Sequence, residues 1–173
     1  SKIDVGIGDK LASYYSFNPD VYISGKLKNT YLNSAYVYAG ANGKIKRYVE
    51  WDATGRYTFA GYEVNDFRVD ANMKFSFYPF RRDKYSPIDL KIHFETGLKE
   101  PDFYQQNLLT NHFRWNNDFS KTSTTKILGE LDIPKWELAA SFGYALLANN
   151  LYYDSKGIVQ QNSGAMSVMT AYL

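Results

Sequence analysis

The two histidines are the residues of this sequence best suited to acid–base or metal chemistry. His93 is followed two positions later by Glu95, and His112 is followed two positions later by Arg114. A hydrolase of the barrel type needs a serine within reach of a histidine, and neither histidine has one at the next same-face position. A nucleophile on an adjacent strand stays open as an alternative. We therefore expect both histidines to be polar residues without catalytic function, and the protein not to be an enzyme.

Other chemical sites lack either the residues or the spacing that they need. The chain has no cysteine, which excludes disulfides, thiolate zinc sites and thiol nucleophiles. Two histidines without cysteine argue against a structural zinc site, and no loop has the spaced acidic ligands of an EF-hand. Residues 6–8 (Gly-Ile-Gly) lack the third glycine and the following helix of a dinucleotide-binding motif. We expect no metal and no cofactor.

The charge balance and the aromatic content restrict the class of protein. Lysine and arginine number 20 and aspartate and glutamate 18, so the net charge of +2 gives no basis for a nucleic-acid partner. The chain is rich in aromatics, with 16 Tyr and 11 Phe, and has a mean hydropathy of −0.44. No apolar run approaches the roughly 20 residues of a membrane helix. This composition fits a membrane β-barrel, whose lipid face uses every second residue, and also a soluble β-sandwich or barrel.

The clearest pattern of the chain lies in residues 66–78. Its even positions are mostly charged or polar, and its odd positions are apolar: Phe67, Val69, Ala71, Met73, Phe75 and Phe77. Because successive side chains of a strand point to opposite faces, this pattern predicts a strand with one apolar and one polar face.

The same alternation recurs at lengths that match a bilayer crossing. It predicts strands within residues 3–15, 21–39, 49–59, 88–99, 112–132, 136–151 and 165–173. Residues 54–55 could divide the third of these, and the alanines and leucines of residues 136–151 would also suit a helix. Turns are expected at residues 17–20 and 133–135, and Asn42-Gly43 favours a type I′ hairpin. Residues 100–111 and 152–164 are expected to be long loops.

Together these segments predict an all-β protein. About eight to ten antiparallel strands, joined by short turns and longer loops, indicate an antiparallel transmembrane β-barrel of the outer-membrane type. Both ends of the sequence fall within alternating segments. We therefore expect one outer-membrane β-barrel domain, residues 1–173, that is a segment of a longer barrel.

Two sets of residues follow from this barrel. Polar residues of the strands should face the lumen, with charges that nearly cancel: Arg68, Asp70, Lys74, Lys91, His93, Glu95, Arg114, Lys126 and Glu130. Aromatic residues near strand ends should lie at the two membrane interfaces, where an apolar ring with a polar edge is favoured: Tyr15, Tyr22, Tyr78, Trp136 and Tyr152.

Several segments resemble one known family. They are WDATGRYTFAGY (51–62), NDF (65–67), EPDFYQQ (100–106), NHFRW (111–115), PKW (134–136) and NLYYD (150–154). Spread over most of the chain, they resemble the putative porins of Bacteroidetes outer membranes. The resemblance implies an outer-membrane barrel and a channel, and it implies no particular substrate.

We therefore expect a porin-like channel in the outer membrane of a Gram-negative bacterium, which passes small polar solutes by passive diffusion. One alternative is a non-conducting structural barrel of an outer-membrane complex, and another is a soluble ligand-binding barrel resembling a lipocalin. The expected partners are outer-membrane lipid and lipopolysaccharide, and other outer-membrane proteins or identical subunits. A nucleic-acid partner is not expected.

Overall fold

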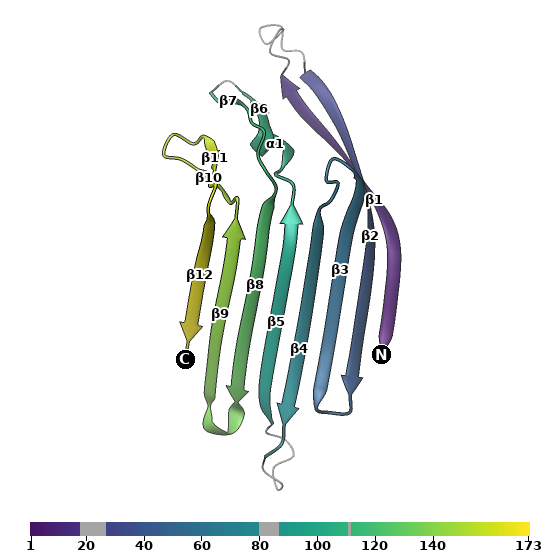
Figure 1. Ribbon diagram of the computed structural model, residues 1–173, viewed down its shortest axis with the longest axis vertical. Helices are drawn as coiled ribbons and strands as arrows, with labels where there is room; N and C mark the ends of the chain where they lie inside the picture. Colours follow the sequence, from purple (N-terminus) through teal and green to yellow (C-terminus); the bar gives the residue numbers. More distant parts are fainter. Residues whose placement is uncertain (18–26, 80–86, 111) are drawn as a thin grey trace.

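Eight long strands form one antiparallel sheet in the computed structural model of the protein (Figure 1). The structure describes residues 1–17, 27–79, 87–110 and 112–173. Neighbours in the sheet follow the order β1-β2-β3-β4-β5-β8-β9-β12, which is also their order in the chain. The predicted all-β, antiparallel fold is thus confirmed. The strands are β1 (Lys2–Phe17), β2 (Leu27–Ile45), β3 (Val49–Gly61), β4 (Phe67–Phe77), β5 (Ile88–Lys99), β8 (Thr122–Ile133), β9 (Leu138–Ala148) and β12 (Ala165–Tyr172).

Short elements occupy the connections after β5, β8 and β9. Between β5 and β8 lie α1 (Phe103–Gln106), β6 (Asn107–Leu109) and β7 (Arg114–Asn116), and β6 pairs with β7. A second small sheet joins β10 (Leu151–Tyr153) to β11 (Val159–Gln161), and the 3-10 helix η2 (Pro134–Trp136) turns the chain from β8 into β9. Among the described residues, no helix is long and apolar enough to cross a membrane.

The large sheet has two edges. Figure 1 shows β1 and β12 on opposite sides of it, with one end of the chain at each edge. Within the described residues the sheet is not closed into a barrel. This arrangement agrees with the expectation of a partial barrel.

Side chains alternate between the two faces of this sheet. The register places Met73 of β4 beside Ile92 of β5 on one face. On the other face, Asn72 lies between Asp52 of β3 and His93 of β5. We call the face of Met73 the apolar face and the face of Asn72 the polar face. The pairing thus confirms the two-faced strands that the alternation predicted.

The apolar face is not covered by the rest of the described chain. Val69 is 37% exposed, Met73 47% and Leu11 79%. In an ordinary soluble domain such side chains would be buried, and an extended exposed apolar surface marks contact with lipid, a ligand or another protein. The buried apolar side chains of the described residues lie instead in loops or at a strand end: Phe103, Ile133 and Val159.

The hairpin expected at Asn42-Gly43 is wrong. Strand β2 continues through both residues, and the chain turns at residues 46–48, where Lys46 adopts φ 52°. Gly43 is explained by packing, because a Cβ there would lie 2.6 Å from Nε1 of Trp51. The glycine therefore makes room for the indole of the neighbouring strand.

The single strand expected over residues 112–132 is also wrong. Residues 117–121 separate β7 from β8, and β7 pairs with β6 outside the large sheet. Arg114 therefore lies on a small hairpin and not on a strand of the barrel sheet. Alternation continued through the polar loop by chance, since a period of two cannot distinguish an interrupted strand from a continuous one.

Two segments with an ambiguous residue pattern are continuous strands. Strand β3 runs unbroken through Thr54 and Gly55, and β9 is a strand, not a helix. The turn expected at residues 17–20 and the aromatic residue Tyr22 lie outside the described residues, apart from Phe17 at the end of β1.

The end of β3 provides a test of the backbone geometry. Gly61 has φ +94°, and a Cβ there would lie 2.0 Å from the carbonyl oxygen of Asn33. Gly61→Ala should therefore lower the free energy of unfolding by about 1–3 kcal/mol, measured by urea titration in detergent. Gly55→Ala is the matched control, because a Cβ at Gly55 meets nothing within 4 Å. Equal stabilities of the two variants would contradict the described turn.

Candidate functional site on the polar face

Rows of charged residues run across the polar face of the large sheet. The register places one residue of each of five adjacent strands, β2 to β5 and β8, side by side in such a row. The row consists of Lys44, Glu50, Lys74, Lys91 and Glu130. Its members extend from residue 44 to residue 130 and become neighbours through strand pairing.

Charges of opposite sign pair along this row. Lys44 forms an ion pair with Glu50, and Nζ of Lys91 lies 3.6 Å from Oε2 of Glu130. These four side chains are between 44% and 59% exposed, so solvent screens the pairs and they contribute little to stability. The main effect of the pairing is that the row presents both signs together.

A second group of charges lies further along the strands, beyond the row that contains Asn72 and His93. Arg68 of β4 donates from Nε to Oδ2 of Asp70 at 2.8 Å, and its Nη2 lies 3.4 Å from Oε1 of Glu95. From β8, Nζ of Lys126 lies 3.5 Å from Oε2 of Glu95. Here too, acidic groups are paired with basic groups.

Part of the polar face is concave. A groove of about 760 Å³ lies on it and is lined mostly by polar residues. They include Asp52, Asn72, Lys91 and His93. Polar solutes could therefore lie against hydrogen-bonding groups from several strands.

At the other end of the sheet, the connection between β5 and β8 crosses the polar face. The ring of Phe103 in α1 stacks on Tyr14 of β1, with centroids 4.6 Å apart. The hydroxyl of Tyr104 donates to the carbonyl oxygen of Tyr15 at 3.2 Å. Because β2, β3 and β4 lie between β1 and β5, the two strands are separated by about 19 Å along the sheet. The connection therefore bridges the polar face and links its two sides.

A partly buried network holds this connection in place. Nζ of Lys121 forms ion pairs with Asp66 and with Glu100, the latter at 3.0 Å. The side-chain amide of Gln106, a buried residue, donates to Oε1 of Glu100 at 2.7 Å. Burial lowers the pKa of Lys121, but the hydrogen bonds to the two carboxylates outweigh burial and raise the pKa above its usual value. The ammonium group is therefore the charged centre of the connection.

The residues predicted to face the lumen are mostly brought together by the structure. All of them except Arg114 lie on the polar face of β4, β5 or β8. Of the aromatic residues expected at membrane interfaces, Tyr15 and Tyr152 lie at the end of the sheet where α1 lies, and Tyr78 and Trp136 lie at the opposite end. Their contact with lipid stays a prediction.

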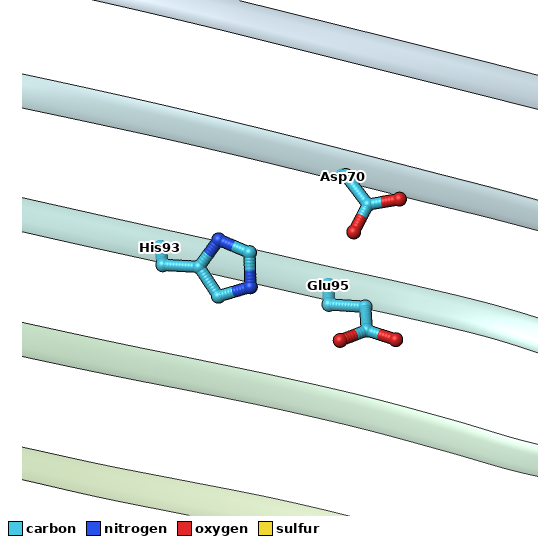
Figure 2. A group of neighbouring side chains, drawn as sticks. All are labelled: Asp70, His93 and Glu95. Carbon is cyan, nitrogen blue, oxygen red and sulfur yellow. The ribbon is translucent and has the colours of Figure 1, made fainter.

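One cluster on the polar face was not predicted as a unit. His93 and Glu95 follow each other on one face of β5, and Asp70 of β4 is paired in register with Glu95. Figure 2 shows the imidazole and the two carboxyl groups on the same side of the two strands, and their potential ligand atoms lie within 4.8 Å of one another. The sequence contained the His-x-Glu spacing, but it could not supply the residue of the neighbouring strand.

The loop contacts were not predicted either. Alternation gives no information on which strand a loop side chain reaches, and Lys121 lies in a weakly patterned segment. The only available signal was the concentration of aromatic residues, including Phe103 and Tyr104, in a segment expected to be a long loop.

Comparison with known proteins agrees with this architecture. A protein family described as putative porin matches residues 2–173, nearly the whole chain. No curated protein and no solved structure matches it.

The charged centre of the connection can be tested directly. Lys121→Met leaves the partly buried carboxylates of Asp66 and Glu100 without their cation, and should lower the free energy of unfolding by about 2–3 kcal/mol. It should also expose residues 100–121 to limited proteolysis. Lys99→Met is the control, because Lys99 and its partner Asp102 are 67% and 64% exposed, and this pair contributes at most about 1 kcal/mol. Similar losses in both variants would show that the network does not hold the connection.

Proposed function

The chain belongs to the putative porin family, and from this premise we propose that small polar solutes diffuse passively through its barrel. Membership implies a β-barrel and an outer-membrane location. The observation that carries the proposal is the contrast between the two faces of the sheet. One face exposes apolar side chains such as Met73, and the other carries rows of charges and a groove.

The strands have the length that a membrane crossing needs. A transmembrane strand takes about 9–11 residues, and β4 has 11 residues while β5 has 12. With the apolar face in contact with lipid, the polar face would surround a water-filled lumen. All backbone groups between neighbouring strands are then bonded within the sheet, which is the condition for a strand to lie in hydrocarbon.

Passive diffusion follows from the chemistry of the polar face. A polar solute in the lumen exchanges hydrogen bonds with water for hydrogen bonds with the walls, instead of losing them in hydrocarbon. Selective ion pores use rings of one charge sign. The row from Lys44 to Glu130 contains both signs, which supports a pore with little preference for anions or cations.

The connection that contains α1 would narrow one mouth of this pore. Phe103 reaches β1 across the polar face, and Pro101 and Gln106 of the same connection are buried. A connection that narrows the pore in this way also favours a second candidate function, a structural barrel that does not conduct. The two functions differ in conductance alone.

The proposal includes the surroundings of the protein. The apolar face would contact lipid and lipopolysaccharide in the outer membrane of a Gram-negative bacterium, and the edges β1 and β12 would pair with further strands or identical subunits. No catalytic function is proposed. A lipocalin-like barrel would require apolar side chains in its interior, whereas here the groove lies on the polar face.

Arginine substitutions on β4 test which face contacts lipid. Met73→Arg should lower the free energy of unfolding by about 2–4 kcal/mol, because Met73 lies near the middle of β4 and a guanidinium near the middle of the bilayer loses its hydration. Asn72→Arg, on the polar face beside Asp52, should cost much less. The measurement is refolding of both variants into lipid vesicles along a denaturant titration. If the two losses were equal, the assignment of the faces would be wrong.

Planar-bilayer recording of the complete protein tests conduction. We expect stepwise current increases as channels insert, and a reversal potential near zero under a potassium chloride gradient, because paired charges cancel along the lumen. A strongly cation- or anion-selective reversal potential would contradict the charge argument. Insertion without current would favour the structural barrel.

A further inference from the structure

We propose that Asp70, His93 and Glu95 form a binding site for a divalent transition-metal ion such as Zn²⁺ on the polar face. The three residues come from adjacent strands, β4 and β5, and lie side by side (Figure 2). The site does not depend on conduction, because the strand register alone assembles it.

The tautomer of His93 follows from its neighbours. Asp52 can only accept a hydrogen bond when ionised, so the bond of 2.9 Å between its Oδ2 and Nδ2 of Asn72 places the Asn72 amide nitrogen towards Asp52. The amide oxygen of Asn72 then lies 2.6 Å from Nδ1 of His93 and must accept from it. Nδ1 therefore carries the proton, and in the neutral imidazole Nε2 has a free lone pair.

This arrangement is the one that metal-binding histidines use. A ligating imidazole almost always donates its second N–H to a neighbouring oxygen, which fixes the ring and its tautomer. In His93 that oxygen belongs to Asn72, which is itself held by Asp52. Figure 2 shows a ring nitrogen directed towards the side of the carboxyl groups of Asp70 and Glu95.

Three electron-pair donors thus converge on one space. The potential ligand atoms of Asp70, His93 and Glu95 lie within 4.8 Å of one another. Bonds of about 2.0–2.2 Å to a tetrahedral Zn²⁺ ion would hold them about 3.4 Å apart. Rotations of the two carboxylate side chains that move their oxygens by about 1 Å would close the site, and the fourth position would remain for water.

The nature of the donors selects the metal. Calcium and magnesium take oxygen ligands almost exclusively, whereas imidazole nitrogen suits zinc, copper, nickel and iron. One nitrogen and two carboxylates therefore indicate a borderline transition-metal ion. A soft ion such as Cu⁺ is disfavoured, since the chain has no cysteine.

A side chain of the protein competes with the metal. Arg68 binds both oxygens of Asp70, at 2.8 and 3.2 Å, and also approaches Glu95. The guanidinium therefore neutralises the carboxylate charge that would attract a metal ion. Its side chain is 63% exposed, and exposed pairs are weak, so an incoming ion can displace it into water.

Isothermal titration of Zn²⁺ into the complete protein, in detergent and without a histidine tag, tests the site. We expect saturable 1:1 binding that His93→Gln weakens at least tenfold, because the imidazole supplies the only nitrogen ligand. His112→Gln is the matched control and should leave the affinity unchanged, since His112 lies in the connection between β6 and β7. Arg68→Ala should strengthen binding, because it removes the competing cation.

Further variants distinguish a specific loss of the metal site from a general loss of structure. Asn72→Ala, which keeps all three ligands, should weaken binding by about tenfold or more, because it frees the ring. Heat-modifiable migration on a gel confirms that each variant is folded, and Asp70→Asn replaces His93→Gln if the latter does not fold. Absence of saturable Zn²⁺ binding, equal loss in the His112 variant, or weaker binding after Arg68→Ala would each overturn the proposal. None of these readouts depends on whether the barrel conducts.

Discussion

The whole structure depends on the hydrogen bonding of the backbone within the sheet, which is also what the proposed membrane-spanning barrel requires of backbone groups in an apolar phase. An antiparallel sheet meets this requirement along every internal strand, and it leaves side chains as the only groups that distinguish its two faces. Strand pairing is continuous from β1 to β12, with one register shift between β2 and β3 at Ala35 and Tyr36, so each residue of a strand is assigned to one face together with its neighbours. This is why Met73 lies beside Ile92, and Asn72 beside His93. The polar face, its charged rows and the three-residue cluster are all consequences of that register.

Much of this fold could be predicted from the sequence, because apolar and polar residues alternate with a period of two in strands such as β4 and β5. The predictions failed where another physical cause produced the same residue pattern. Gly43 resembled a hairpin residue but serves the close approach of Trp51. Arg114 continued the alternation but lies on a separate hairpin.

The site could be predicted only as a face and not as a set of contacts. The alternation of polar and apolar residues was enough to predict that Lys91 and Glu130 face the lumen. Their pairing could be known only from the register of β5 and β8. The same holds for Asp70 beside Glu95. Loop contacts such as Phe103 on Tyr14 were beyond reach, since no periodicity relates a connection to a strand four positions away in the sheet.

The central claim is that the polar face of the sheet borders water and the apolar face borders lipid. Because the chain has no cysteine, single cysteines can be placed at successive positions 69–74 of β4, and no native thiol of the chain reacts with the reagent. In the complete protein reconstituted into vesicles, a charged, membrane-impermeant thiol reagent should react rapidly at positions 70, 72 and 74. It should react slowly at positions 69, 71 and 73, where a lipid-dissolved quencher should instead reach an attached fluorophore. Equal rates along the strand, or rates with the opposite alternation, would contradict the account.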